Sequence, residues 1–337
     1  MRAVGYQIPQ SIDAETALVN FDLPRPEPTG RDILVEVKAV SVNPVDTKIR
    51  ASAKPEPGQW KVLGWDAAGI VTAVGPKATL FKPGDEVFYA GAINRSGTNA
   101  EYHLVDERIV GKKPATLDFL AAAALPLTSI TAWEMLFDRL DVSRPVPGAA
   151  NAILIIGGAG GVGSIAIQIV RALTNLTVIA TASRPETQDW VKALGAHHVI
   201  DHRKPLAAQV AALGVGQPAF VFSTTNTDDH LSEIVDLIAP QGRLGLIDDP
   251  RELSALPLKR KSISLHWELM FTRSLYSTAD IEKQHELLNR IGALVDEGRI
   301  KSTLNESFGA INAENLKRAH ALIESGKAKG KIVLAGF

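Results

Sequence analysis

Alternation between apolar and polar positions dominates the first 120 residues of the chain. In "DILVEVKAVSVN", Ile33, Val35, Val37 and Ala39 fall on one face, which is the period-2 pattern of a half-buried strand. The segments "AAGIVTAVG" and "GDEVFYAG" continue the pattern, and Pro-Gly pairs mark turns between them. The pattern therefore predicts a β-rich domain in the form of a partly open barrel.

The spacing of apolar residues changes to a helical one near residue 120. The segment "LDFLAAAALPLTSITAWEMLFDRL" is spaced as a helix that is interrupted at Pro126. From Asn151 strands and helices alternate, beginning with "AILIIG", a continuous apolar run typical of a parallel strand covered on both faces. Repeated units of this kind build a doubly wound sheet, so we expect an α/β protein. Two amphipathic helices and a short strand, "KIVLAG", are predicted after residue 275.

Composition narrows the class of protein. A length of 337 residues suggests two domains, and 45% hydrophobic with 22% charged residues is ordinary for a soluble globular protein. The net charge of −1 favours neither nucleic acid nor an anionic membrane as a partner. We expect the longest apolar runs to fall short of a membrane span, and the opening residues to form a strand rather than a signal peptide. These features predict a cytoplasmic protein.

The complete absence of cysteine has direct chemical consequences. It excludes disulfides, thiolate zinc sites, iron–sulfur clusters and a cysteine nucleophile.

A glycine-rich turn follows the apolar run. "GGAGGVG" contains Gly158-x-Gly160-x-x-Gly163 between a predicted strand and a predicted helix, which is the context of a dinucleotide-binding fingerprint. Gly158 allows a tight turn, Gly160 lets the backbone approach a pyrophosphate, and Gly163 permits close packing of helix on strand. The backbone N–H groups at the helix start, including those of Gly161 and Val162, would bind the anion. The alternative is a purely structural turn.

The end of the next strand favours NADP(H) as the cofactor. An NAD site usually has an acidic residue about 20 residues past the fingerprint, but this strand ends in "ATASRPE". Ser183 and Arg184 suit a 2′-phosphate, which a carboxylate would repel. His202 and Arg203, after the following strand, could approach the same pocket. Alternatively, Arg184 only solvates the start of a helix.

The whole chain resembles the medium-chain dehydrogenase/reductase superfamily. The motifs "SVNPVDTKIR", "VLGWDAAGIVTAVG", "AEYHLV" and "ESGKAKGKIVLAG" are similar to its quinone-oxidoreductase branch, and "ELMFTRSLYST" to a bacterial subfamily labelled zinc-type alcohol dehydrogenase-like. The resemblance implies a GroES-like catalytic domain formed by residues 1–125 and 270–337. It also implies a Rossmann nucleotide-binding domain formed by residues 126–269.

The zinc ligands of that superfamily are missing. Zinc members carry a cysteine where this chain has Asn43, and Gly-His-Glu where it has Gly64-Trp65-Asp66. Three His, Asp or Glu residues could in principle assemble a replacement site, but we expect no metal. Without a Lewis acid, a conjugated acceptor is easier to reduce than a simple ketone, because the charge spreads over an enolate or hydroquinone.

The resemblance therefore implies a zinc-independent enzyme that transfers a hydride from NADPH to a quinone or an α,β-unsaturated carbonyl. The alternatives are a zinc-type alcohol dehydrogenase and a non-catalytic NADPH-binding redox sensor. The segment "KSISLHWELMF" is similar to the one by which nucleotide domains of the superfamily pair, so we expect a homodimer. The alternative is an edge strand covered by its own domain.

Further site residues follow from the resemblance alone. Asn43 would lie beside the nicotinamide and hydrogen-bond an acceptor oxygen, or else cap a turn in "NPVD". Asp46 would be a capping or orienting residue, and a polar role for it at the edge of the substrate pocket stays open. Tyr89 would line the substrate pocket or pack in the core. The other positions matched to cofactor contacts are Thr128, Ile247, Phe271 and Arg273. Thr128 could instead cap a helix after Pro126, and Arg273 could instead form a structural ion pair.

Overall fold

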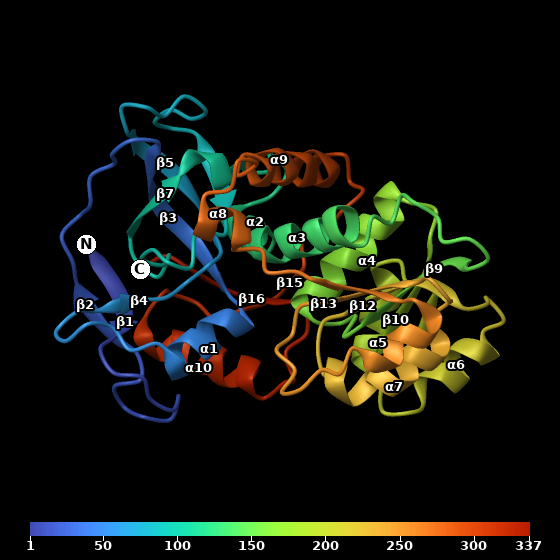
Figure 1. Cartoon of the computed structure of the whole chain (residues 1–337). Coiled ribbons are helices and arrows are strands. Elements are labelled where there is room, and N and C mark those ends of the chain that lie inside the picture. The colour runs from blue at the N-terminus through green and yellow to red at the C-terminus, as the bar shows by residue number, and fades with distance from the viewer. The chain divides into compact units, whose positions relative to one another are not determined.

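The computed structural model describes all 337 residues, which divide into two compact units (Figure 1). Unit 1 comprises Met1–Ile130 and Phe271–Phe337, and unit 2 comprises Thr131–Met270. The boundaries expected from the sequence were 125/126 and 269/270. The first boundary falls later in the structure because helix α3 (Pro126–Trp133) runs through it.

Unit 1 is built on two sheets. The larger has the strand order β15-β16-β3-β5-β6-β8, with β7 paired to β3, and the smaller has the order β2-β1-β4. The strands are β1 (Arg2–Tyr6), β2 (Val19–Asp22), β3 (Asp32–Val42), β4 (Lys61–Val62), β5 (Ala67–Val74), β6 (Glu86–Tyr89), β7 (Tyr102–Asp106), β8 (Val110–Lys112), β15 (Leu304–Ser307) and β16 (Lys331–Ala335). The helices are α1 (Pro44–Ser52), η1 (Glu107–Ile109), α2 (Phe119–Ala123), α8 (Thr272–Tyr276), α9 (Lys283–Asp296) and α10 (Ala313–Glu324). The predicted β-rich domain is confirmed.

Strand β3 organises unit 1 because it pairs with three neighbours, β5, β7 and β16. Its apolar residues Ile33, Val35 and Val37 are buried, as the alternation predicts, but Leu34, Val40 and Val42 are buried too, so β3 is more than half-buried. The pairing with β16 is antiparallel, with Ile332 opposite Val42. This register brings the beginning of the last strand of the chain to the end of β3, where Asn43 follows.

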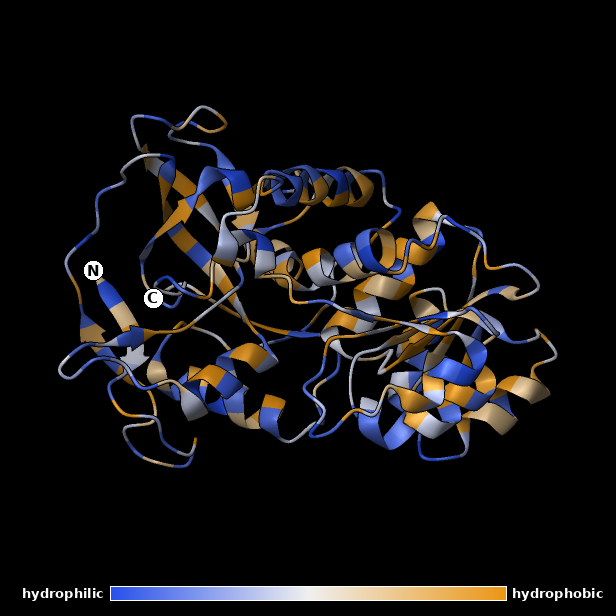
Figure 2. Cartoon of the chain, in the orientation of Figure 1, coloured by the Kyte–Doolittle hydropathy of each residue, from blue (hydrophilic) through white to orange (hydrophobic).

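The two helices predicted near the C-terminus are α9 and α10. On α9 the buried side chains are apolar ones such as Leu287, Leu288 and Ile291, and Figure 2 shows hydrophobic and hydrophilic residues mixed along this helix. The mixture is that of a helix with one face against the core.

Unit 2 is a six-stranded parallel sheet with the order β11-β10-β9-β12-β13-β14, flanked by helices (Figure 1). The strands are β9 (Ala150–Ile156), β10 (Thr177–Thr181), β11 (His198–Ile200), β12 (Pro218–Ser223), β13 (Arg243–Leu246) and β14 (Ser264–Trp267). The helices are η2 (Glu134–Arg139), α4 (Gly161–Leu173), α5 (Pro185–Ala193), α6 (Leu206–Ala212), α7 (Thr227–Leu237) and η3 (Leu256–Lys261). This is the doubly wound order, in which the direction of winding reverses beside β9. The predicted Rossmann fold is confirmed.

One helical stretch corrects an expectation from the sequence. The stretch Phe119–Arg139 is 21 residues long, and its most apolar window of 18 residues has a mean hydropathy of 1.4, which is enough, by length and composition only, to cross a membrane. The apolar run around Ala121–Leu127, expected from the sequence to fall short of a membrane span, is thus part of a longer helical stretch that reaches this length. In the structure 78% of the most apolar window is buried. The protein itself therefore covers most of these side chains, as in a core helix.

Unit 2 contains a buried pair of carboxyl groups. Glu134 begins η2, a turn of π-helix, and Glu268 directly follows β14. The Glu268 carboxyl accepts from Arg139 Nε at 2.7 Å and is also hydrogen-bonded to Glu134. Burial, followed by the charge of Glu134, raises the pKa of Glu268 to about 8. Two carboxyl groups can bond each other only when one carries a proton, so this contact requires a proton shared by the pair.

This pair predicts a pH-dependent stability. The pKa of Glu268 rises from 4.5 to about 8 on folding, so the stabilisation is complete below about pH 4.5 and is lost as the pH rises through 8. We expect Glu268→Gln, which imitates the protonated form, to flatten the decline of Tm between pH 5 and 9 in thermal melts. The exposed Glu56→Gln is the control and should leave the slope unchanged. An equally steep decline in Glu268→Gln would contradict the shared proton.

Candidate active site

Four polar side chains from separate segments meet in the interior of unit 1. Asn43 follows β3, Asp46 lies in the first turn of α1, Asp66 precedes β5, and Lys331 begins β16. Their exposed fractions are 1%, 1%, 0% and 3%. We call these four residues the polar cluster.

The ammonium group of Lys331 holds the polar cluster together. Lys331 Nζ donates to the carbonyl oxygen of Val42 at 3.0 Å, to Asp66 Oδ2 at 3.0 Å, and to Asn43 Oδ1. The other amide atom, Asn43 Nδ2, donates to Asp66 Oδ2 at 2.8 Å. The backbone N–H of Leu127 donates to Asp66 Oδ1 at 2.7 Å. Both carboxylate oxygens of Asp66 are thus occupied by donors from the protein.

Asp46 is a buried carboxyl group that caps a helix. Its two oxygens accept from the backbone N–H groups of Asn43, at 2.7 Å, and Gly64, at 2.9 Å. Gly64 has φ +110°, and a Cβ there would lie 2.5 Å from Thr98 Oγ1, so only glycine fits this approach. Burial raises the pKa of Asp46 to about 7, against the opposing effect of the N–H donors. The capping role expected for Asp46 is what the structure shows.

Asn43 has protein partners for most of its hydrogen-bonding capacity. Its oxygen faces Lys331 and one amide hydrogen faces Asp66. The remaining contacts of Nδ2, to the carbonyl oxygens of Ser41 and Trp65, are both long at 3.4 Å. Donation to a substrate oxygen therefore stays a prediction for Asn43, and it has one amide hydrogen to use.

Tyr89, the third predicted catalytic residue, is buried against His103. The rings stack with centroids 5.5 Å apart, and the Tyr89 hydroxyl lies 3.2 Å from His103 Nδ1. His103 Nε2 lies 2.8 Å from the carbonyl oxygen of Ser96, which can only accept, so we assign the ring proton to Nε2. Burial lowers the pKa of His103 to about 4, so the ring is neutral and its Nδ1 accepts from Tyr89. These contacts favour the core-packing alternative for Tyr89, and a catalytic role stays a prediction.

The other predicted residues of unit 1 also have internal contacts. Trp65 donates from Nε1 to the carbonyl oxygen of Ala92 at 3.2 Å and packs edge-on against Phe271, with ring centroids 6.2 Å apart. Thr128 Oγ1 donates to the Leu125 carbonyl oxygen at 3.2 Å. Arg273 pairs with Asp280 at 2.9 Å, as in its structural alternative.

The glycine turn of unit 2 joins β9 to α4. A Cβ on Gly163 would lie 2.4 Å from the Gly157 carbonyl oxygen and 2.7 Å from Gly158 Cα, so this glycine is required by helix–strand packing. Gly160, the N-cap of α4, has φ −72°, and the nearest atom to a Cβ there is 3.4 Å away. The protein's own packing therefore leaves room at Gly160. A glycine that its own fold does not need fits a bound pyrophosphate at the start of a helix.

Basic side chains gather at the carboxyl ends of β10 and β11. Arg184 is the N-cap of α5, and its Nε pairs with Glu186 at 2.8 Å. Arg203 donates to the Ser183 carbonyl oxygen at 2.7 Å and pairs with Asp201. Burial lowers the pKa of His202, and the charges of Arg203 and Arg184 lower it further. Arg184, His202 and Arg203 thus form one basic group beside Ser183.

Ile247, another predicted cofactor contact, lies directly after β13.

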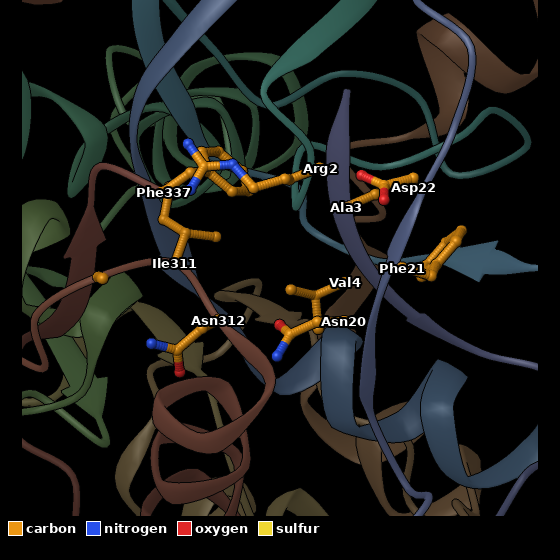
Figure 3. Close-up of a pocket in the computed structure, with 10 residues that line it drawn as sticks. Arg2, Ala3, Val4, Asn20, Phe21, Asp22, Ile311, Asn312 and Phe337 are labelled. Carbon is orange, nitrogen blue, oxygen red and sulfur yellow. The ribbon is translucent and has the colours of Figure 1, made fainter.

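A well-defined cavity of unit 1 lies away from these residues. It has a volume of about 470 Å³ and lies among β1, β2 and the start of α10 (Figure 3). Its lining includes Arg2, Asn20, Phe21, Asn312 and Phe337. Asn20 and Asn312 already accept from N–H groups of the first turn of α10. None of the predicted site residues lines this cavity.

Comparisons with known proteins identify the family. A model described as an alcohol dehydrogenase GroES-like domain matches residues 29–115, and one described as a zinc-binding dehydrogenase matches residues 194–334. A zinc-type alcohol dehydrogenase-like protein of Staphylococcus aureus (strain MSSA476) is 41% identical over 338 aligned positions, 99% of either chain. The quinone oxidoreductase of Lama guanicoe is 30% identical over 325 positions, 95% of this chain and 93% of the relative. The chain belongs to the medium-chain dehydrogenase/reductase superfamily, in its quinone-oxidoreductase branch.

A solved structure agrees with this assignment. A Rhizobium etli CFN 42 protein, provisionally assigned as a zinc-dependent alcohol dehydrogenase, is 68% identical and has a TM-score of 0.98. The match covers 100% of this chain and 98% of the other. This member of the superfamily is thus an NAD(P)-dependent oxidoreductase.

The zinc in the names of these relatives does not fit the residues of this chain. No group of three or more His, Cys, Asp or Glu residues is placed to hold a metal ion. Of the residues that match zinc-ligand positions, Trp65 has no metal-binding atom, and the amide oxygen of Asn43 accepts from Lys331. The nearby carboxylate of Asp66 is occupied on both oxygens.

Gly160 and Gly163, two of the three fingerprint glycines, are predicted to affect stability and cofactor binding differently. Gly160→Ala should keep the wild-type Tm within about 1 °C while weakening NADPH binding at least tenfold, because only the ligand needs that space. Gly163→Ala should lower the Tm by several degrees, because its Cβ meets backbone atoms. Thermal melts and NADPH fluorescence titration measure both effects. If Gly160→Ala binds NADPH as tightly as wild type, the pyrophosphate does not lie on this turn.

Proposed function

We propose that this protein is a zinc-independent reductase that transfers a hydride from NADPH to a quinone or an α,β-unsaturated carbonyl. The observation that carries the proposal is the polar cluster. A protein ammonium group already satisfies the side chains that would face a metal, so the chain offers no donor set for zinc. The resemblance to a quinone oxidoreductase at 30% identity over nearly the whole chain supports the acceptor class.

The chemistry of the acceptor follows from the missing Lewis acid. Bound NADPH supplies the hydride. Reduction of a simple ketone builds an alkoxide that a metal would stabilise, whereas a conjugated acceptor spreads the same charge over an enolate or a hydroquinone. The protein is then left to orient the acceptor and to offer hydrogen-bond donors to its oxygen. We propose Asn43 as such a donor, with Asp46 holding its backbone and Tyr89 shaping the wall of the substrate pocket.

NADP(H) is proposed over NAD(H) on the basis of the charges beside Ser183. Strand β10 ends without a carboxylate, and Arg184, His202 and Arg203 gather at its end. Guanidinium groups bind phosphates through charge-assisted hydrogen bonds. The proposed cofactor contacts are Thr128, Gly158, Gly160, Gly161, Val162, Gly163, Ser183, Arg184, His202, Ile247, Phe271 and Arg273.

A cytoplasmic homodimer is proposed as the working form. Strand β14 is the last strand of its sheet and pairs only with β13. Trp267 and Leu269, at its end, are 51% and 52% exposed. An open strand edge flanked by exposed apolar side chains is suited to pairing with a second copy.

A substrate panel tests the proposed function. Quinones, enones, aldehydes and alcohols should be assayed with NADPH and with NADH. Turnover of 1,4-benzoquinone or an enone with NADPH supports the proposal. Turnover confined to alcohols and aldehydes would favour a zinc-type alcohol dehydrogenase, and tight NADPH binding without any turnover would favour a redox sensor.

Metal analysis gives an independent prediction. We expect elemental analysis of the purified protein to find less than about 0.1 zinc per chain, because no donor set is present. Activity should survive prolonged chelation. About one tightly bound zinc per chain, lost together with activity, would overturn the zinc-independent mechanism.

The basic group predicts the cofactor preference. Arg184→Ala should raise the Kd of NADPH about ten- to a hundredfold, because a charge-assisted contact to the 2′-phosphate is lost. The Kd of NADH, which lacks that phosphate, should change less than about twofold. Lys192→Ala, which removes a positive charge near the other end of α5, is the matched control and should leave both constants unchanged. Equal weakening of both cofactors by Arg184→Ala would make Arg184 a structural residue.

A further inference from the structure

We propose that Lys331 is a positioning residue that, together with Asp66, sets the orientation of the Asn43 amide so that one amide hydrogen is left for the acceptor oxygen. The inference rests on the proposed function, which it deepens by naming how the donor is held.

Lys331 cannot itself serve the substrate as a donor. An ammonium group has three N–H donors and no acceptor. Its three donors are matched by three acceptors of the protein, the Val42 carbonyl oxygen, Asn43 Oδ1 and Asp66 Oδ2. Because every one of its donors is used, Lys331 acts only through its partners.

The partners determine which way the Asn43 amide points. The oxygen and nitrogen of an amide can be exchanged by a flip, and the choice is made by the surrounding donors and acceptors. An ammonium group can face only the oxygen, and the carboxylate of Asp66 can face only the NH₂ group. Lys331 and Asp66 therefore permit a single orientation of the Asn43 side chain.

That orientation leaves one amide hydrogen without a close acceptor. Nδ2 carries two hydrogens, and the one directed to Asp66 is bonded at 2.8 Å. The nearest other acceptors, the carbonyl oxygens of Ser41 and Trp65, are both 3.4 Å away, at the long limit of a hydrogen bond. The positive charge of Lys331 beside Oδ1 also polarises the amide and strengthens the remaining N–H as a donor. A carbonyl oxygen that gains negative charge during hydride addition is the acceptor this donor suits best.

A double-mutant cycle tests the inference. Removal of the ammonium alone leaves the Asp66 carboxylate buried without its cation, so the test uses Lys331→Met combined with Asp66→Asn, which keeps the interior neutral. This variant should fold and lower kcat/KM for an enone about tenfold, with the Kd of NADPH unchanged. Asn43→Ala should cause a similar loss. Adding Asn43→Ala to the neutral variant should cost less than twofold more, because both changes remove the same contact.

Two further measurements separate positioning from a structural role. Lys331→Arg, which retains the positive charge, should recover part of the kcat lost in Lys331→Met, and Lys38→Met, a partly exposed lysine on β3, should behave as wild type. In ¹⁵N-labelled protein the side-chain amide resonances of Asn43 should shift and exchange faster with solvent in the neutral variant. This spectroscopic readout does not depend on turnover.

The outcomes distinguish the inference from the proposed function. Independent, multiplicative losses from the neutral variant and Asn43→Ala would overturn the positioning role, as would unchanged Asn43 amide resonances. If wild-type protein reduces neither quinones nor enones, the proposed function fails, and the resonances alone then decide whether Lys331 orients Asn43.

Discussion

The burial of one ammonium group among two carboxylates is the constraint on which the candidate active site depends. Lys331 and Asp66 are almost completely withdrawn from water, and moving such charges into the interior costs several kcal/mol each. The cost is offset only because every donor and acceptor of the pair is matched, by Val42, Asn43 and the backbone of Leu127. Such a pair adds little to stability compared with an apolar core, but it fixes geometry, since loss of either partner leaves a buried charge uncompensated. The pair fixes three segments in one arrangement, namely the end of β3, the start of β16 and the residues before β5.

The same constraint supports the proposal that this chain works without zinc. A catalytic zinc ion needs three protein ligands, and it would hold the surrounding segments together through those bonds. Here an ammonium group with three hydrogen bonds links the corresponding segments, so the fold keeps its arrangement without a metal. An ammonium group with all its donors occupied cannot polarise a substrate carbonyl as a Lewis acid does. The proposed reaction, addition of hydride to an acceptor that is already conjugated, is the one that needs the least polarisation of the acceptor.

Sequence reasoning located the features that depend on neighbouring residues and missed those that depend on distant ones. The period-2 pattern of β3, the apolar run of β9 and the glycine fingerprint each lie within one short segment, so a local pattern is enough to predict them. Lys331 lies 265 residues from Asp66, and nothing in "GKIVLAG" marks its lysine as buried. The pairing of Glu134 with Glu268 also joins residues far apart in sequence. The length of the apolar stretch from Phe119 to Arg139 was not predicted, for a related reason. Hydropathy records how apolar a helix is, whereas the surrounding fold decides what covers it.

The charge balance of the polar cluster links this geometry to proton uptake. The polar cluster has two carboxyl groups and one ammonium group. Asp66 contacts the Lys331 ammonium group directly, whereas Asp46 feels its charge without a hydrogen bond to it. Both oxygens of Asp46 accept backbone N–H groups, an arrangement that suits the ionised form, yet burial raises its pKa to about 7. A proton on Asp46 would meet two donors and no acceptor, so one of the contacts to Asn43 and Gly64 must lengthen when it binds. Because the N–H of Asn43 is one of those two donors, the protonation state of Asp46 acts on the residue whose amide Lys331 orients. Asn43 is thus held from both sides, at its side-chain amide by Lys331 and Asp66 and at its backbone N–H by Asp46.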